Sequence, residues 1–150
     1  GQVLQIFADA YTPVVDSSAI PTGEIASVEG TPMDFRTEKQ IGQDIRADFE
    51  QLHFTGGYDH NYVLGRPGEK KIMANAYCRE SGIALEAETD CCGVQFYAGN
   101  FIGEQTGKGG AFCLESQFYP NAVNEPDFPS PVVKAGHTYH TETSYRFYLR

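Results

Sequence analysis

The stretch IALEAETD, residues 83–90, alternates between uncharged and acidic side chains. One side of it holds Ile83, Leu85, Ala87 and Thr89, and the other holds Glu86, Glu88 and Asp90. Successive side chains of a β-strand point to opposite faces, so this period of two predicts a strand with one face in a core and one in water. Such one-sided strands are typical of antiparallel sheets.

The same alternation continues elsewhere and predicts a mainly β protein. Residues 138–149 alternate over their whole length and predict a long final strand. Further strands are expected at residues 3–8, 25–29, 58–64, 72–78, 94–98 and 111–117. Sixteen glycines and eight prolines separate these segments at short intervals, as turns between strands do. The expected fold class is all-β, an antiparallel sandwich or barrel.

Helical and irregular segments are few. The one expected helix is short and falls within residues 37–49, and the four prolines of residues 119–131 predict an extended loop. No repeat or domain boundary interrupts residues 1–150, so we expect a single domain or the C-terminal portion of one. The chain begins at Gly1 and enters a strand-like run at once, which suggests a piece of something longer.

Charge and composition narrow the range of partners. The formal charge is −9, from 11 basic and 20 acidic residues with no basic cluster, which argues against nucleic acid or an anionic membrane. No stretch is apolar over the length of a membrane span. The four cysteines lack the spacing of a zinc site, so reduced thiols and a cytoplasmic location are expected. A small, weakly charged ligand fits this composition.

Glu115 is the one carboxylate of the strand-like run AFCLESQF, residues 111–118. Strand alternation turns Phe112 and Leu114 to one side and Cys113, Glu115 and Gln117 to the other. Burying an ionisable group is costly unless the group is paired or functional. In partly apolar surroundings this carboxylate would hold its proton more tightly than in water and would suit a catalytic base.

Asp59 and Gln95 are candidate ligand-binding residues. Asp59 follows a glycine pair in TGGYDHNYVL, residues 55–64, where polar groups gather at the entrance of a strand. A simple turn cap explains that position equally well. Gln95 lies beside aromatic residues in GVQFYAGNF, residues 93–101, and amides with aromatic rings suit sugars. Ordinary cross-strand packing is the more frequent explanation for an isolated triplet of this kind.

Other kinds of chemistry find no support in the sequence. The four histidines, His53, His60, His137 and His140, form no recognised metal-ligand motif, so no metal is expected. The chain has no GxSxG nucleophile motif and no nucleotide-binding GxGxxG or Walker sequence.

Several long motifs, taken in order, resemble the aldose 1-epimerases, or galactose mutarotases, over nearly the whole chain. They are ADAYTPVVD, IPTGEIASVEGTPMDFR, GYDHNYVL, TDCCGVQFYAGNF and GKGGAFCLESQFYPNAVNEPDFPS. The matched motifs are those of the C-terminal half of that family. The resemblance implies an antiparallel β-sandwich of the galactose mutarotase type, with an open sugar cleft on one sheet.

The resemblance also implies an activity, the interconversion of α and β anomers of aldohexoses such as galactose and glucose without a cofactor. Glu115 then matches the family's catalytic base, and Asp59 and Gln95 match residues that hold sugar hydroxyls. The family's acid, a histidine in an NHTYFNL-like motif, has no counterpart in these 150 residues. A missing N-terminal half or a second chain is therefore an expected partner.

The sequence departs from the family pattern at two places, and the chain as a whole has three possible interpretations. The loop from Gly107 to Phe112 is shorter than in relatives, and Cys91-Cys92 replaces a polar residue followed by proline. The chain is interpreted as part of an epimerase, as a non-catalytic carbohydrate-binding fragment, or as a structural remnant with exposed sheet edges.

Overall fold

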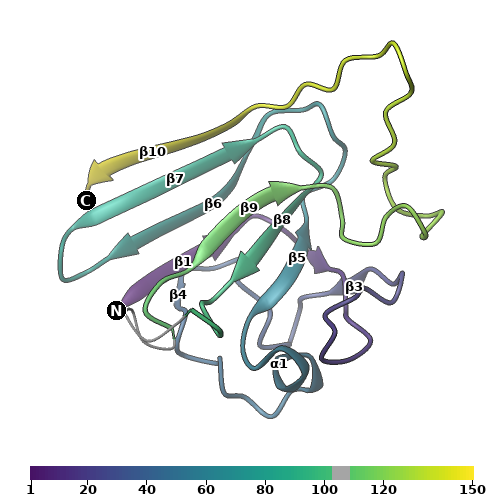
Figure 1. Ribbon diagram of the computed structural model, residues 1–150. Helices are drawn as coiled ribbons and strands as arrows, with labels where there is room; N and C mark the ends of the chain where they lie inside the picture. The colour runs from purple at the N-terminus through teal and green to yellow at the C-terminus, as the bar shows by residue number, and fades with distance from the viewer. Residues whose placement is uncertain (103–108) are drawn as a thin grey trace.

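The computed structural model describes residues 1–102 and 109–150, and within them ten strands form two five-stranded antiparallel sheets (Figure 1). The first sheet, in spatial order, contains β10 (Thr143–Leu149), β7 (Ile83–Thr89), β6 (Lys71–Cys78), β1 (Gln2–Ile6) and β4 (Lys39–Gln40). The second contains β3 (Ala26–Ser27), β2 (Ala10–Tyr11), β5 (Asp59–Val63), β8 (Gly93–Tyr97) and β9 (Cys113–Gln117). The all-β sandwich expected from the alternating patterns is confirmed.

The hydrophobic core lies between the two sheets. Leu4 of β1 and Met73 of β6 are fully buried on one side, and Tyr62 of β5 and Phe96 of β8 are fully buried on the other. Phe96 stacks on Tyr58 with 5.2 Å between ring centroids. Burying an aliphatic or phenyl side chain of this size contributes roughly 1.5–3 kcal/mol, so this layer holds the sheets together.

The buried tyrosines keep their hydroxyls hydrogen-bonded. Tyr58 donates to the carbonyl of Pro32 at 3.0 Å, and Tyr62 donates to the carbonyl of Met33 at 3.0 Å. Burial raises the pKa of both phenols, so they stay neutral donors. These bonds attach β5 to the segment between β3 and β4.

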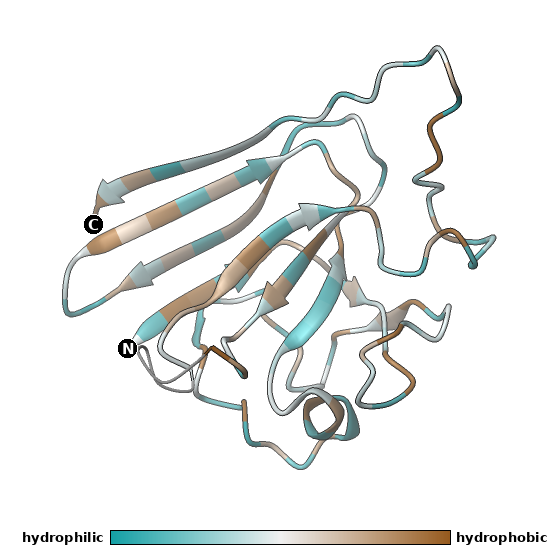
Figure 2. Ribbon diagram, viewed as in Figure 1, coloured by the Kyte–Doolittle hydropathy of each residue, from teal (hydrophilic) through white to brown (hydrophobic). Residues whose placement is uncertain are grey.

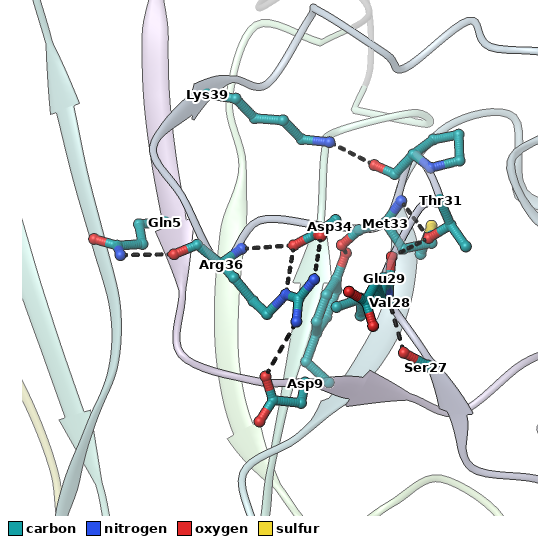
Figure 3. A network of polar contacts seen from close by, with 12 residues as sticks. Gln5, Asp9, Ser27, Val28, Glu29, Thr31, Met33, Asp34, Arg36 and Lys39 are labelled. Atoms are coloured by element: carbon teal, nitrogen blue, oxygen red, sulfur yellow. Dashed lines mark hydrogen bonds and ion pairs between the residues drawn. The ribbon is translucent and has the colours of Figure 1, made fainter.

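A polar network fixes that segment in turn (Figure 3). The Arg36 guanidinium binds Asp34 at 2.7 Å and lies 3.7 Å from Asp9, while Gln5 of β1 donates to the Arg36 carbonyl at 2.8 Å. Lys39 donates to the Pro32 carbonyl at 2.7 Å. The Pro32 and Met33 carbonyls are therefore held where Tyr58, just before β5, and Tyr62 of β5 need acceptors.

The charged alternation of β7 is visible as bands of opposite hydropathy along the strand (Figure 2). On its polar side, Glu86 pairs with Arg146 of β10 at 2.9 Å, and Glu88 lies 3.7 Å from Lys70. On its apolar side the end of β10 is open, since Phe147 is 69% and Leu149 81% exposed. The first sheet thus extends beyond the part that the second sheet covers.

The short helix was expected in the wrong place. Residues 41–49 form turns, and the helix α1 is Glu50–Thr55. Its start, Phe49, supplies no side-chain cap, but Gly56 ends it with φ of 68° and an N–H bond to Leu52. Packing of Gln51, Leu52 and Thr55 against the body of the protein, rather than a sequence cap, sets its position.

Two strand predictions also need correction, and two short strands need to be added. The final strand was expected over residues 138–149, but it begins at Thr143, because the N–H of Glu142 is bound by the Asp90 carboxylate at 2.9 Å instead of by a strand. The strand expected at residues 25–29 is two residues long, and the two-residue strands β2 and β4 were not foreseen. The proline-rich segment 119–131 is a loop, as expected, but turns rather than extended backbone make up most of residues 120–127.

Candidate functional site

Polar side chains gather on the outer face of β5, β8 and β9, the face turned away from the core. In β5 the inward residues His60 and Tyr62 are 1% and 0% exposed, which leaves Asp59 and Asn61 on the other side. The register of the three strands forms three rows across this face. They are Asp59–Tyr97–Cys113, Asn61–Gln95–Glu115 and Val63–Gly93–Gln117.

Asp59, Gln95 and Glu115, the three residues expected from sequence, therefore meet on one surface. Gln95 Nε2 donates to Asp59 Oδ1 at 2.8 Å. Glu115 is the direct cross-strand partner of Gln95, one strand further along the sheet. Directly opposed residues of an antiparallel pair have Cβ atoms roughly 4.5–5.5 Å apart, so the Glu115 and Gln95 side chains leave the sheet together.

Two further residues that sequence reasoning did not select join this group. Gln117 Nε2 donates to Gln95 Oε1 at 3.0 Å and to Asn61 Oδ1 at 3.3 Å. The bonds link three strands through a series of amides that ends on the Asp59 carboxylate. The available signal was the alternation that put Gln117 on the same side as Glu115.

Gly93 provides the space for this arrangement. A Cβ atom at Gly93 would lie 2.3 Å from Asn61 Oδ1 and 3.0 Å from the Tyr119 ring. The missing side chain lets the Asn61 amide lie over β8, where Gln117 reaches it from β9. Tyr119, which packs edge-on against Phe128 with ring centroids 5.1 Å apart, closes this end of the face.

Glu115 differs from the expectation in one respect, because its side chain is exposed rather than set in apolar surroundings. The reason is topological: β9 is the last strand of its sheet, so one flank of Glu115 has no neighbouring strand. Among the ion pairs of the described residues, none involves Asp59 or Glu115.

Side chains of the opposite sheet hold β9 in place. Tyr145 of β10 donates its hydroxyl to the Leu114 carbonyl at 2.7 Å, and the Ser116 and Thr143 hydroxyls lie 2.6 Å apart. Burial and the negative charge of Glu115 raise the pKa of Tyr145, which keeps the phenol a donor. The strand that carries Glu115 is thus fixed on both sides of that residue.

The histidines do not join the site. His60 points into the core, where its Nδ1 accepts the Asp59 N–H at 3.2 Å, and burial lowers its pKa to about 4. His53 lies 3.5 Å from Asp48 at the helix, and His137 and His140 are exposed in the segment before β10. The described residues hold no group of three or more potential metal ligands.

A cavity of about 830 Å³ lies elsewhere, at the end of the sandwich near Gly1. Its described lining residues include Gln2, Arg46, Asn100 and Phe112 but no Asp, Glu or His. It therefore offers no side-chain carboxylate or imidazole from that lining for proton transfer. The shortened loop expected before Phe112 includes residues 107 and 108, which lie outside the described residues.

The architecture is that of the galactose mutarotase sandwich. It matches a crystal structure of an aldose epimerase homologue from C. elegans with a TM-score of 0.79 and 26% identity, over 99% of this chain and 46% of that one. The structure of a galactose 1-epimerase from Lactobacillus acidophilus shares the fold, with a TM-score of 0.71 at 23% identity, over 99% of this chain and 44% of that one.

The chain belongs to the aldose 1-epimerase family, whose model matches residues 1–146. It is 43% identical to the galactose mutarotase of Sus scrofa over 150 residues, covering 95% of this chain and 42% of the relative. It is 36% identical to the aldose 1-epimerase of Escherichia coli K12, covering 96% of this chain and 44% of the relative. The chain thus spans less than half the length of the curated relatives it matches. Within the described residues no helix has the length and apolar character needed to cross a membrane.

Proposed function

We propose that this chain carries the base and part of the sugar-binding face of an aldose 1-epimerase acting on aldohexoses such as galactose and glucose. The observation that supports this most directly is the meeting of Glu115 with the Asp59-bound Gln95 on one open face. Family membership sets the reaction class, and the geometry supplies groups suited to it.

In the proposed reaction Glu115 removes the proton of the anomeric hydroxyl. The electron pair of that oxygen forms the carbonyl at C1, the bond from C1 to the ring oxygen breaks, and an acid protonates the ring oxygen. Rotation about the C1–C2 bond and closure with the two roles reversed give the other anomer. The sugar leaves with the same atoms and no cofactor is consumed.

Asp59 and Gln95 hold the sugar in this scheme. Gln95 uses one N–H for Asp59 Oδ1, which leaves its second N–H and the other Asp59 oxygen for sugar hydroxyls. Both groups are half-buried, so little side-chain freedom is lost when the sugar binds. Fixing the ring in this way aligns the anomeric hydroxyl with Glu115.

The complementary acid is not assigned to this chain. His60 faces the core and stays neutral, and the NHTYFNL-like motif of the family acid does not occur in the 150 residues. We propose that the acid comes from the part of the family's length that this sequence does not span, in the same polypeptide or in a second one. The four cysteines are free thiols, which fits the cytoplasm as the proposed location.

The test is Glu115→Gln in the natural protein that contains this chain, with galactose mutarotation followed by polarimetry. Loss of a positioned base lowers a rate by about 10² to 10⁴, so the catalysed rate should fall by that factor. Glu86→Gln, the same change on the other sheet, is the matched control and should keep the rate. A Glu115→Gln protein with the normal rate would refute the role of this residue.

A further inference from the structure

We propose that Gln117 is a positioning residue of this site, which fixes the orientation of the Gln95 amide and through it the Asp59 carboxylate. Gln117 is not assigned a contact with the sugar. The inference rests on the proposed function, because positioning matters only if Gln95 and Asp59 bind a ligand.

The direction of the hydrogen bonds fixes the orientation of the Gln95 amide. An ionised Asp59 can only accept, so the amino group of Gln95 must face it and the Gln95 carbonyl must face the other way. That carbonyl meets the Gln117 amino group at 3.0 Å. Turning the Gln95 amide over would set an oxygen against the Asp59 oxygen and an amino group against the amino group of Gln117. The two contacts therefore select one orientation.

Gln117 is itself held in the orientation that donates. The same Nε2 atom binds Asn61 Oδ1 at 3.3 Å, and Asn61 is 2% exposed. A flipped Gln117 amide would present its oxygen to the Gln95 carbonyl oxygen, which is repulsive. Asn61 Oδ1 gives the Gln117 amino group a second acceptor.

The strand register makes this contact possible at Gly93. Gly93 is the direct partner of Gln117, and the Asn61 oxygen occupies the space where a Cβ of residue 93 would lie. A side chain there would separate β9 from β5 on this face. The contact therefore needs the right residue on each of three strands, Asn61 on β5, Gly93 on β8 and Gln117 on β9.

Loss of Gln117 should leave the Gln95 amide held by Asp59 alone and therefore less firmly fixed for the ligand. A hydrogen bond to a neutral partner contributes modestly to binding, and leaving one of its partners without a bond costs more. We therefore expect Gln117→Met, which keeps the length but removes the amide, to weaken galactose binding about tenfold. Gln117→Glu should weaken it further, because an ionised carboxylate repels the Gln95 carbonyl.

The first experiment needs no sugar and uses the chain as it is. The side-chain amide of Gln95 is observed by ¹⁵N NMR and assigned from its absence in Gln95→Met. In the wild type one N–H is bound to Asp59 and the other is not, so the two proton shifts should differ widely. In Gln117→Met the difference should shrink, while Gln43→Met, an exposed glutamine on a turn, should leave it unchanged. An unchanged Gln95 signal in both Gln117 variants would overturn the proposal.

The second experiment separates positioning from general structural damage. Galactose affinity is measured in a double-mutant cycle of Gln117→Met and Gln95→Met in the natural protein that contains this chain. If Gln117 acts through Gln95, its substitution should cost about tenfold in the wild type and less than twofold when Gln95 is already replaced. Equal costs in both backgrounds would overturn the proposal. A wild-type protein that binds no galactose would refute the proposed function, while the amide spectra would still decide the role of Gln117.

Discussion

The two sheets present two polar outer faces that the sequence describes in nearly the same way. On the first, Glu86 pairs with Arg146 and Glu88 lies near Lys70. On the second, Asp59 and Glu115 have no cationic partner among the described residues and stand among neutral amides instead.

This difference separates a solvated surface from a candidate binding site. Exposed ion pairs contribute about 0–1 kcal/mol and satisfy their own charges, which leaves little for a ligand. Carboxylates beside oriented amides keep free acceptors and donors that match sugar hydroxyls. Alternation in the sequence identifies which face of a strand points outward. Whether the carboxylates on that face pair with cations or lie beside amides distinguishes a solvated surface from a candidate binding site.

The largest expected effect is on ligand affinity at the second face. Asp59→Ala removes the acceptor that orients Gln95 and one group proposed to bind hydroxyls, and hydrogen bonds to charged groups are worth about 1.5–3 kcal/mol. Galactose affinity measured by titration calorimetry should fall about 10- to 100-fold. Glu86→Ala on the first face should change it less than twofold, and equal losses in both variants would erase the distinction between the faces.

The buried His60, beneath the second face, should make the free energy of unfolding depend on pH. His60 has its pKa lowered by burial from 6.5 to about 4, so the unfolded chain takes up a proton more readily than the folded one. Stability is full above pH 6.5 and falls as the pH drops toward 4, by about 3 kcal/mol in all and about 2 kcal/mol between pH 7 and pH 5.

Urea denaturation at pH 7 and pH 5 measures this effect. His60→Leu should reduce the loss of stability on acidification, whereas His53→Gln, at an exposed position on the helix, should leave it unchanged. If acid destabilises the wild type and the His60→Leu variant equally, other groups carry the pH dependence.

The substitution Gly93→Ala should have the next largest effect, because it fills a space that the fold needs. A methyl group added there meets Asn61 Oδ1 at 2.3 Å, and overpacking of this kind typically costs about 1–3 kcal/mol. Gly93→Ala should therefore lower both the free energy of unfolding and galactose affinity. Gly42→Ala is the control, because a Cβ at Gly42 has nothing within 4 Å. A stable Gly93→Ala protein with normal affinity would show that the face does not need this gap.

The smallest effect is expected at the first face. Arg146→Met removes the partner of Glu86, and because the Arg146 side chain is 66% exposed the free energy of unfolding should change by less than about 1 kcal/mol. Urea denaturation and galactose titration on the same protein check this. A larger loss of either quantity would mean that the charged face is more than a solvated surface.

The fold and part of the candidate site are predictable from the sequence for different reasons. Alternation in residues 83–90 predicted β7 well because its period is a local property of the strand. The helix was misplaced because packing of Leu52 and the Gly56 terminus, not a local cap, set it. Asp59, Gln95 and Glu115 came from motifs.

The remaining site features depend on strand register, which no local pattern supplies. Gly93 opposite Gln117 is a relation between residues on two strands, and Asn61 joins them from a third. The exposure of Glu115 was missed for a similar reason, since its place on an edge strand follows from the order of the whole sheet.

The most direct test of the difference between the faces is a galactose titration of the ¹⁵N-labelled chain followed by NMR. We expect shifts in the side-chain amides of Gln95 and Gln117 and in the backbone of Glu115, with the signals of Glu86 and Arg146 unmoved. Shifts confined to β7 and β10, or spread equally over both faces, would contradict it.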